Sequence, residues 1–467
     1  MLIRHLVGII SVDVLTVHTI AGQFDVVTAE EADATPDVSS LLQVAMQTVQ
    51  KSGESSQEEG QSSAACTAES LSSKDLDLVI FGAYGFTGSL SAEYLGQGHP
   101  ENPQWAIAGR KEDELKALFD TLPNKPQASI VADLDNATSL DALTARTKVV
   151  LTYAGPYEHY GGEALIRSAI EGCAHYVDIT GENHWKQSMM SKYGKLAKER
   201  GVSIVQSAGF DSMPADLMGM LAAESFASAQ NEPPDGVLAV FTKKNGWMSG
   251  GTKASGVYST AAHGLATLDP YFLLPESAPE CHVDTSPDGM EGFGYDPHLQ
   301  ATLRQASSGS IDGPVLRRSL RVRFPSSCIH AGVCQTAEVE TSGAEFFADP
   351  RMLTDPPPSP LTMLPGDGPP RWMQEDGSFA LHGVARGDST PNQSCATLNV
   401  MGDPGYFATA RMSTELALGL ALDSPQRGYQ TPSLALGAKN LKARLEKVLH
   451  LDGGKAFTFG ETCPFEQ

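Results

Sequence analysis

Short apolar runs alternate with amphipathic segments between residues 76 and 207. Runs of four to six residues rich in Val, Ile and Leu predict buried strands, and apolar residues at helical spacing predict the helices between them. This alternation predicts βαβ units, and therefore an α/β fold with a Rossmann-type parallel sheet and helices on both faces. The expected strands are Leu76–Phe81, Trp105–Gly109, Ser129–Ala132, Val149–Tyr153, His175–Ile179 and Val202–Ser207, and the expected helices are Thr87–Leu95, Glu112–Leu122, Gly162–Gly172 and Trp185–Arg200.

The pattern becomes irregular after Phe210. We expect a second, mixed α+β domain for substrate binding or dimerisation, with an exposed Pro-rich loop near residues 350–370. The expected domains are an N-terminal extension at 1–74, a Rossmann domain at 75–215, the mixed domain at 216–400 and C-terminal helices at 401–467. The expected elements after Phe210 are helices over Ala215–Ala229, Ala254–Leu268, Thr409–Leu422 and Leu434–Leu449, and strands over Gly236–Lys243, Leu316–Phe324 and Cys334–Val339.

The N-terminal extension carries little that a globular core could bury. Leu2–Ile20 is apolar but interrupted by charged and histidine side chains, so it is too polar to span a bilayer and leaves only a weak targeting signal. We expect a short amphipathic helix over Ser39–Lys51 and disorder over Ser52–Ser73.

Composition narrows the partners and the compartment. The formal net charge of −23 argues against nucleic acid or an anionic membrane as the main electrostatic partner. Seven scattered cysteines without a CxxC pair favour reduced intracellular thiols, and a cytoplasmic or a membrane-associated location stays open. The twelve histidines show no HExxH-like spacing, so we expect no metal site.

A glycine-rich turn joins the first expected strand to the first expected helix. Gly82 permits a tight turn, Gly85 lets a pyrophosphate approach the backbone, and Gly88 allows close packing of helix and strand. The helix N-terminus then offers N–H groups and a partial positive charge to phosphates. A structural βα turn is the alternative, but the flanking strand and helix favour a nucleotide site. The remaining side chains expected at this site are Tyr84, Phe86 and Thr87.

The end of the second expected strand indicates which dinucleotide binds. It carries Arg110 and Lys111 with no acidic residue before Glu112, and a guanidinium suits a phosphate monoester. We therefore expect NADP(H), with Arg110 at the 2′-phosphate; a solvated arginine at a helix start is the alternative. Asp133, at the end of the third expected strand, either faces the adenine or caps the following helix.

The fourth expected strand ends at a small, stiff surface, Ala154-Gly155-Pro156. A nicotinamide ring could lie on it, unless it is an ordinary Gly-Pro turn. A hydride acceptor often needs a proton delivered nearby. The candidate proton donors, each of which could instead be structural, are Tyr157, His159, Tyr160 and Glu182.

Two further segments are candidates for substrate binding. Asp211 and Ser212 follow the sixth expected strand, where they either face the crevice or cap the next helix. The second segment precedes a helix whose N-terminus could hold an anionic substrate group, or else it permits close backbone packing, as at a dimer contact. This second segment is Ser249, Gly250, Gly251 and Thr252.

Together these segments resemble the saccharopine dehydrogenase-like oxidoreductases, a family that includes bacterial trans-acting enoyl reductases. The resemblance implies an NADP-binding Rossmann domain, a mixed domain that completes the cleft, and C-terminal segments that return to the first domain. It also implies lipid-linked substrates and association with lipid droplets or membranes. The matching segments are GAYGFTG (82–88), AIAGR (106–110), AGPY (154–157), YGGE (160–163), HYVDITGE (175–182), GFDSMPADL (209–217), SGGT (249–252), DPY (269–271) and GDPGYFATARM (402–412).

Two functions follow from these observations. The first is an NADPH-dependent oxidoreductase that reduces a C=C (enoyl) or C=N bond of a small-molecule or lipid-linked substrate in lipid or glycolipid metabolism. The second is a non-catalytic NADP-binding scaffold or sensor at lipid droplets or membranes, which stays open because no single proton donor stands out. The sequence leaves a homodimer open in both cases.

Overall fold

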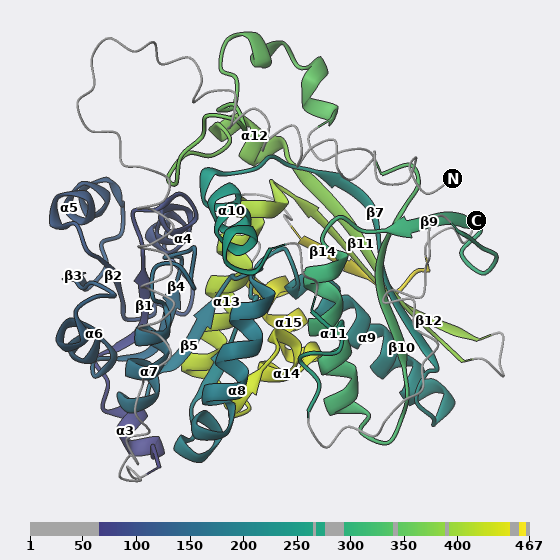
Figure 1. Cartoon of the computed structure of the whole chain (residues 1–467), viewed down its shortest axis with the longest axis horizontal. Helices are drawn as coiled ribbons and strands as arrows, with labels where there is room; N and C mark the ends of the chain where they lie inside the picture. Colours follow the sequence, from purple (N-terminus) through teal and green to yellow (C-terminus); the bar gives the residue numbers. More distant parts are fainter. Residues whose placement is uncertain are drawn as a thin grey trace. The chain divides into compact units, whose positions relative to one another are not determined.

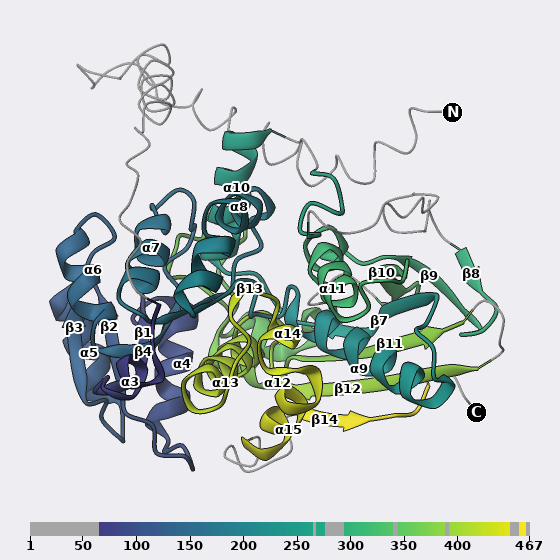
Figure 2. The ribbon, with the colours of Figure 1, turned by 90° about the horizontal axis from the view of Figure 1, so that it is seen from below.

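The computed structural model describes residues 65–264, 268–275, 294–339, 344–387, 392–448 and 457–463. Ala64–Gln467 forms one compact unit, shown in two views in Figures 1 and 2. The helix expected at Ser39–Lys51 and the weak targeting signal lie outside the described residues.

A seven-stranded parallel sheet with flanking helices confirms the predicted Rossmann-type fold. Its strand order, β13-β6-β5-β4-β1-β2-β3, reverses between β1 and β4, which creates the switch point where open α/β sheets bind ligands. The sequence pattern does not predict α6. The strands are β1 (Leu76–Phe81), β2 (Trp105–Gly109), β3 (Ala128–Val131), β4 (Thr147–Thr152), β5 (His175–Asp178), β6 (Ser203–Val205) and β13 (Gly428–Gln430), and the helices are α4 (Phe86–Gly96), α5 (Glu112–Thr121), α6 (Ala137–Thr144), α7 (Glu163–Glu171), α8 (Asn183–Arg200) and α9 (Met213–Gln230).

Strand β1 separates two hydrophobic cores. Leu78 and Ile80 belong to the core on one face of the sheet, whereas Val79 and Phe81 belong to the core on the other face. Successive side chains of a strand point to opposite faces, so a strand that is covered on both sides reads as a continuous apolar run. This explains why the central strands of the sheet are visible in the sequence.

A second seven-stranded sheet is mixed, with the order β14-β12-β11-β7-β10-β9-β8. Strands β7 and β10 are parallel and the other neighbouring pairs are antiparallel. Helices α9 and α11 pack against this sheet. The strands are β7 (Gly236–Asn245), β8 (Gly294–Asp296), β9 (Ala301–Gln305), β10 (His330–Thr336), β11 (Ser378–Arg386), β12 (Gln393–Met401) and β14 (Phe457–Gly460), and the other helices are α3 (Ala68–Ser72), α10 (Gly250–His263), α11 (Gly309–Arg323), η1 (Ala344–Ala348), η2 (Pro350–Leu353), α12 (Arg371–Asp376), η3 (Pro404–Ala408), α13 (Thr409–Leu422), α14 (Pro432–Leu436) and α15 (Ala438–Val448).

The strand predicted over Leu316–Phe324 is wrong, because this segment lies in helix α11. Apolar and arginine residues alternate near its end, which imitates a strand, but Leu316 and Leu320 are buried four residues apart. Leu316 packs directly on α9, where a Cβ on Gly219 would come within 2.5 Å of the leucine side chain. The sequence of this segment fits both a helical and a strand periodicity, and packing against α9 decides in favour of the helix.

The prediction of reduced cysteines is also wrong. Cys66 forms a disulfide with Cys173, and Cys395 forms one with Cys463, at sequence separations of 107 and 68 residues. No local spacing pattern reveals pairs so far apart. Cys66 lies in Ser52–Ser73, which the sequence predicted to be disordered and whose end instead forms α3. Disulfides are typical of oxidising compartments.

The C-terminal helices α13, α14 and α15 lie between the two sheets, drawn in yellow in Figures 1 and 2. Helix α13 packs on β4 and α4, whereas α15 packs on α9 and β14. The chain thus contributes to both sheets after residue 401, since β13 extends the first sheet and β14 extends the second. No helix in the described ranges is long and apolar enough to cross a membrane.

Candidate functional site

A cavity of about 650 Å³ opens at the switch point of the parallel sheet. Its lining comes from the loops after β1, β2, β3 and β4, from the start of α10 and from the Pro-rich loop. The sequence predicted several of these loops as binding segments independently, and the fold brings them to one crevice. No group of three or more potential metal ligands occurs within the described ranges.

The glycine-rich turn after β1 has the shape that a phosphate site needs. Gly82 has a φ of +74°, and its N–H donates to the Ala108 carbonyl at 2.9 Å. A Cβ on Gly88 would lie 2.3 Å from the Gly82 carbonyl oxygen, so only glycine permits this close packing of α4. Gly85 precedes the helix without any side-chain capping bond, which leaves the first-turn N–H groups available to an anion.

Arg110 lies at the carboxyl end of β2, exposed and in the cavity lining beside Lys111. Lys111 is 3.8 Å from Glu114, a weak surface pair, so both basic groups remain available to a phosphate monoester. Asp133 also lines the cavity, and it does not cap α6. Asn136 caps that helix, accepting the Ser139 N–H at 3.1 Å.

The loop after β4 forms the opposite wall. Ala154 and Gly155 line the cavity, and a cis peptide bond joins Gly155 to the buried Pro156. The Ala154 backbone lies so close to Gly82 that a Cβ there would come within 3.0 Å of the Ala154 nitrogen. The backbones of the two loops are therefore in close contact, and Ala154 and Gly155 present a small surface to the cavity beside the glycine-rich turn.

Two of the four candidate proton donors are directed away from the cavity. The buried Tyr157 hydroxyl donates to the Thr152 carbonyl at 3.0 Å, and burial raises the Tyr157 pKa well above its usual value. The Glu182 carboxylate accepts from the Tyr157 and Glu158 N–H groups, both at 3.0 Å, and from the Ser255 hydroxyl at 2.9 Å. Both residues shape the β4 loop, and neither belongs to the cavity lining.

His159 and Tyr160 do line the cavity. The His159 ring stacks on Tyr258 of α10, with centroids 3.7 Å apart and planes within 13°. This contact holds the imidazole beside the Ala154–Gly155 surface. Among the four candidates, these two are the ones that line the cavity.

The N-terminus of α10 is largely occupied by protein groups. The Ser249 N–H donates to the Tyr406 hydroxyl at 2.6 Å, the Gly250 N–H donates to the Asp367 carbonyl at 3.0 Å, and the Thr252 N–H donates to the Ser249 hydroxyl at 3.3 Å. Only Ser249 and the small Gly251 reach the cavity lining. The geometry favours the close-packing alternative for this segment over a free anion site.

Packing is tightest at Gly250, where a Cβ would lie 1.8 Å from the Leu364 carbonyl oxygen. Leu364 belongs to the Pro-rich loop, and Pro365 and Gly366 line the cavity next to it. The sequence places this loop correctly on the surface but does not show that it closes one side of the site.

Asp403 and Tyr406 support the structure of the site and were not singled out by sequence reasoning, although they lie in the GDPGYFATARM segment. Asp403 is buried, and its carboxylate accepts the Tyr406 N–H at 2.7 Å and the Trp247 N–H at 3.3 Å. Burial raises the pKa of Asp403 to about 7. The Tyr406 ring contacts Phe86 edge-on at 5.2 Å, so the π-helical turn η3 braces both the glycine-rich turn and α10.

Asp211 and Ser212 do not line this cavity. They follow β6, and the buried Ser212 hydroxyl donates to the Ile311 carbonyl of α11 at 3.4 Å. Ser212 precedes α9 but makes no side-chain capping bond. The helix-cap alternative therefore fails for Ser212, and both residues lie where the parallel sheet meets α11.

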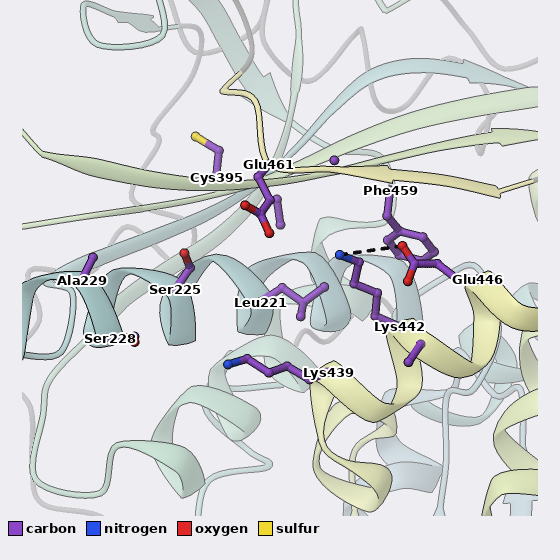
Figure 3. Close-up of a pocket in the computed structure, with 13 residues that line it drawn as sticks. Leu221, Ser225, Ser228, Ala229, Cys395, Lys439, Lys442, Glu446, Phe459 and Glu461 are labelled. Carbon is purple, nitrogen blue, oxygen red and sulfur yellow. Dashed lines mark ion pairs between the residues drawn. The ribbon is translucent and has the colours of Figure 1, made fainter.

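A second cavity, of about 520 Å³, lies between α9, α15 and β14 (Figure 3). Lys439, Lys442, Glu446 and Glu461 project around it, and Lys442 pairs with Glu446 at 3.8 Å. Two ammonium groups and two carboxylates give it no net charge, and none of the candidate site residues lines it. The switch-point cavity is therefore the candidate active site.

Comparison with known proteins agrees with this geometry. Residues 78–205 match the family model of the saccharopine dehydrogenase NADP binding domain. A trans-acting enoyl reductase of Mycobacterium bovis is 30% identical over 408 residues, covering 78% of this chain and 94% of the relative. A lipid droplet localized protein of Caenorhabditis elegans is 41% identical over 148 residues, covering 30% of this chain and 34% of the relative.

Among solved structures, apo saccharopine dehydrogenase (L-Glu forming) from Saccharomyces cerevisiae aligns over 83% of this chain and 100% of its own, with 13% identity and a TM-score of 0.45. The family-model match supports NADP(H) as the cofactor, in agreement with the glycine-rich turn and Arg110. The chain belongs to the saccharopine dehydrogenase-like family of NADP(H)-dependent oxidoreductases, with trans-acting enoyl reductases among its relatives.

Proposed function

We propose that this protein is an NADPH-dependent reductase of a C=C or C=N bond in a lipid-linked substrate. The observation that supports this most directly is the convergence of the phosphate-type turn, Arg110 and the Ala154–Gly155 surface on one cavity with His159 and Tyr160. When bound there, NADPH would supply a hydride from its nicotinamide ring.

The residues of the cavity have separate tasks in this proposal. The first-turn N–H groups of α4 bind the pyrophosphate, and Arg110 with Lys111 binds the 2′-phosphate. Ala154 and Gly155 would support the nicotinamide ring, because a methyl group and a hydrogen atom allow its close approach. His159 or Tyr160 holds a proton near the reacting bond. The Pro-rich loop limits the access of water.

Exposed apolar side chains around the cavity favour a lipid-linked substrate and a lipid surface. Leu361 and Leu364 are 62% and 67% exposed, and Leu364 directly precedes Pro365 of the cavity lining. Lys253 ties this loop to α10 by donating to the Leu361 carbonyl at 2.7 Å. Large exposed apolar patches mark membrane or partner contacts. Other exposed apolar or aromatic side chains are Tyr160 after β4, Met248 before α10, Val257 and Tyr258 in α10, Phe347 in η1 and Leu353 in η2.

The relatives point in the same direction. Trans-acting enoyl reductases and a lipid droplet localized protein are among the similar proteins, and we extend both properties to this chain as proposals. The two disulfides support an oxidising environment for this chain, as a proposal separate from that of a lipid droplet.

A fluorescence titration with NADPH and NADH, followed by NADPH oxidation with a panel of 2-enoyl thioesters and cyclic imines, tests the reductase proposal. We expect NADPH to bind more tightly than NADH and to be oxidised with at least one substrate class. Saturable NADPH binding without oxidation across the whole panel would refute the reductase and favour the scaffold function.

Flotation with neutral phosphatidylcholine vesicles tests the lipid surface separately. The double variant Leu361→Ser/Leu364→Ser should bind vesicles at least about 100-fold more weakly than the wild type, since burying each leucine is worth about 1.5–3 kcal/mol and about 1.4 kcal/mol is tenfold. Leu196→Ser, at a leucine of α8 that is 40% exposed, is the matched control. Equal flotation of all three proteins would refute this surface.

A further inference from the structure

The Pro-rich loop forms one side of the switch-point cavity with a tightly bonded turn. We call residues 361–370 the strap; its Pro365 and Gly366 belong to the cavity lining. The Asp367 N–H donates to the Leu364 carbonyl at 2.9 Å, and the Leu364 N–H donates to the Asp367 carboxylate at 2.7 Å. Gly366 has a φ of +104°, and a proline followed by such a glycine is the pattern of a type II turn. These four residues, the tip of the strap, are therefore held in one shape.

Buried residues flank the exposed tip on both sides. Met363 is 3% exposed and Pro369 is also buried, whereas residues 364–367 between them are exposed. The Pro369 carbonyl accepts the Gln374 side-chain N–H at 2.7 Å, which joins this end of the strap to α12. Exposed segments with few buried apolar contacts open at the lowest free energy, so the tip is the part of the strap that opens most readily.

The tip docks on the first residue of α10. The Gly250 N–H donates to the Asp367 carbonyl at 3.0 Å, and a Cβ on Gly250 would lie 1.8 Å from the Leu364 carbonyl oxygen. Glycine is therefore the residue that permits this contact. The adjacent Ser249 and Gly251 line the cavity, so the docking position lies at the edge of the site.

The other end of the strap lies against the glycine-rich turn. A Cβ on Gly368 would come within 2.2 Å of the ring of Phe86, which is the first residue of α4 and part of the cavity lining. Arg371, directly after the strap, donates to the Glu93 carboxylate of α4 at 2.9 Å. The strap therefore connects α10 with α4, beside the first-turn N–H groups that the proposed function assigns to the pyrophosphate.

We propose that the strap is a lid, whose tip opens to admit NADP(H) to the cavity and opens again to release it. This rests on the NADPH site of the proposed function. A dinucleotide that reaches from the glycine-rich turn to the Ala154–Gly155 surface would occupy the cavity that Pro365 and Gly366 help to line. With the tip docked on α10, the strap encloses it, so the opening of the tip limits both entry and exit.

Stopped-flow fluorescence of NADPH measures the two rate constants without any substrate. Gly250→Ala places a Cβ where the Leu364 carbonyl lies, so it should displace the tip from α10. Overpacking of this kind corresponds to a change of roughly tenfold, so the rate constants of association and release should both rise roughly tenfold. The Kd should then change much less than either rate constant. Gly256→Ala is the matched control, because its Cβ on the same helix meets nothing within 4 Å.

A second pair of variants loosens the tip itself and does not depend on whether Gly250→Ala folds. Asp367→Ala removes the acceptor of the Leu364 N–H, so both rate constants should rise roughly threefold or more. Asp367→Asn keeps a side-chain oxygen that accepts this N–H, so it should retain the wild-type rates. Because Asn also lacks the charge of Asp367, this comparison separates the turn from electrostatic repulsion of the phosphates.

The two rate constants distinguish a lid from a simple contact with the cofactor. A faster release with unchanged association in Gly250→Ala and Asp367→Ala would overturn the lid, since a lost contact speeds release alone. Wild-type values of both rate constants in both variants would overturn it as well. In either case the reductase stands if the wild type oxidises NADPH. If the wild type does not bind NADPH, the cofactor site of the proposed function fails, and the lid fails with it.

Discussion

Arg110→Ala should weaken the binding of NADPH without changing the binding of NADH. A charged hydrogen bond is worth about 1.5–3 kcal/mol, and the lower end applies because Arg110 is exposed to solvent. About 1.4 kcal/mol corresponds to a tenfold change, so the Kd for NADPH should rise roughly tenfold. NADH lacks the 2′-phosphate, so its Kd should stay the same. The preference for NADPH should therefore fall by the full tenfold factor.

Fluorescence titration of both dinucleotides at one fixed salt concentration measures this effect. Arg146→Ala is the matched control, because Arg146 is a partly exposed arginine that pairs with Asp75 at 2.7 Å and lies outside the cavity lining. Lys111 should retain part of the preference, so Arg110→Ala/Lys111→Ala should weaken NADPH further. Unchanged NADPH binding, or equal losses for NADPH and NADH, would refute the assignment of Arg110.

Three further predictions concern stability. Gly88→Ala should cost about 1–3 kcal/mol and weaken NADPH binding, since the new Cβ would lie 2.3 Å from the Gly82 carbonyl oxygen; urea unfolding and NADPH titration measure both. Burial lowers the pKa of His175 to about 3 from 6.5, so the free energy of unfolding should fall as pH drops from about 6.5 toward 3; urea titrations across this range should show a flatter profile for His175→Gln. The double variant Cys66→Ser/Cys173→Ser should lose about 2–4 kcal/mol in urea unfolding.

Each of these has an outcome that would contradict it. Gly256→Ala is the glycine control, because its Cβ would meet nothing within 4 Å, and equal losses at Gly88 and Gly256 would refute the packing argument. A pH profile that His175→Gln leaves unchanged would mean that other groups carry the acid sensitivity. Free thiols at Cys66 and Cys173 in peptides mapped without reductant would refute the disulfide.

The sequence predicts the parallel sheet well, because its strands are buried on both faces and read as apolar runs. It predicts the second sheet less well. The paired strands β11 and β12 escape notice, and α11 is mistaken for a strand where Leu316 and Leu320 fit two periodicities. In both cases the deciding contacts come from α9, which lies at least 79 residues earlier in the sequence.

The candidate site is likewise predictable from the sequence only in part. Backbone-determined features such as the glycine-rich turn and Arg110 are predictable because their role follows from their place at the end of a strand. Side-chain direction is not: Tyr157 and His159 are two residues apart, yet the Tyr157 hydroxyl bonds to the Thr152 carbonyl inside the fold while His159 faces the cavity.

The last strand of the parallel sheet has a consequence for synthesis. β13 pairs with β6 but follows it by roughly 220 residues, which take on the order of 10–45 s to translate at 5–20 residues per second. During that time the edge of β6 has no partner strand, and an unpaired edge invites association with other chains. The cofactor-binding half therefore starts folding first and is completed late. A nascent chain stalled before Gly428 would present an open sheet edge to chaperones.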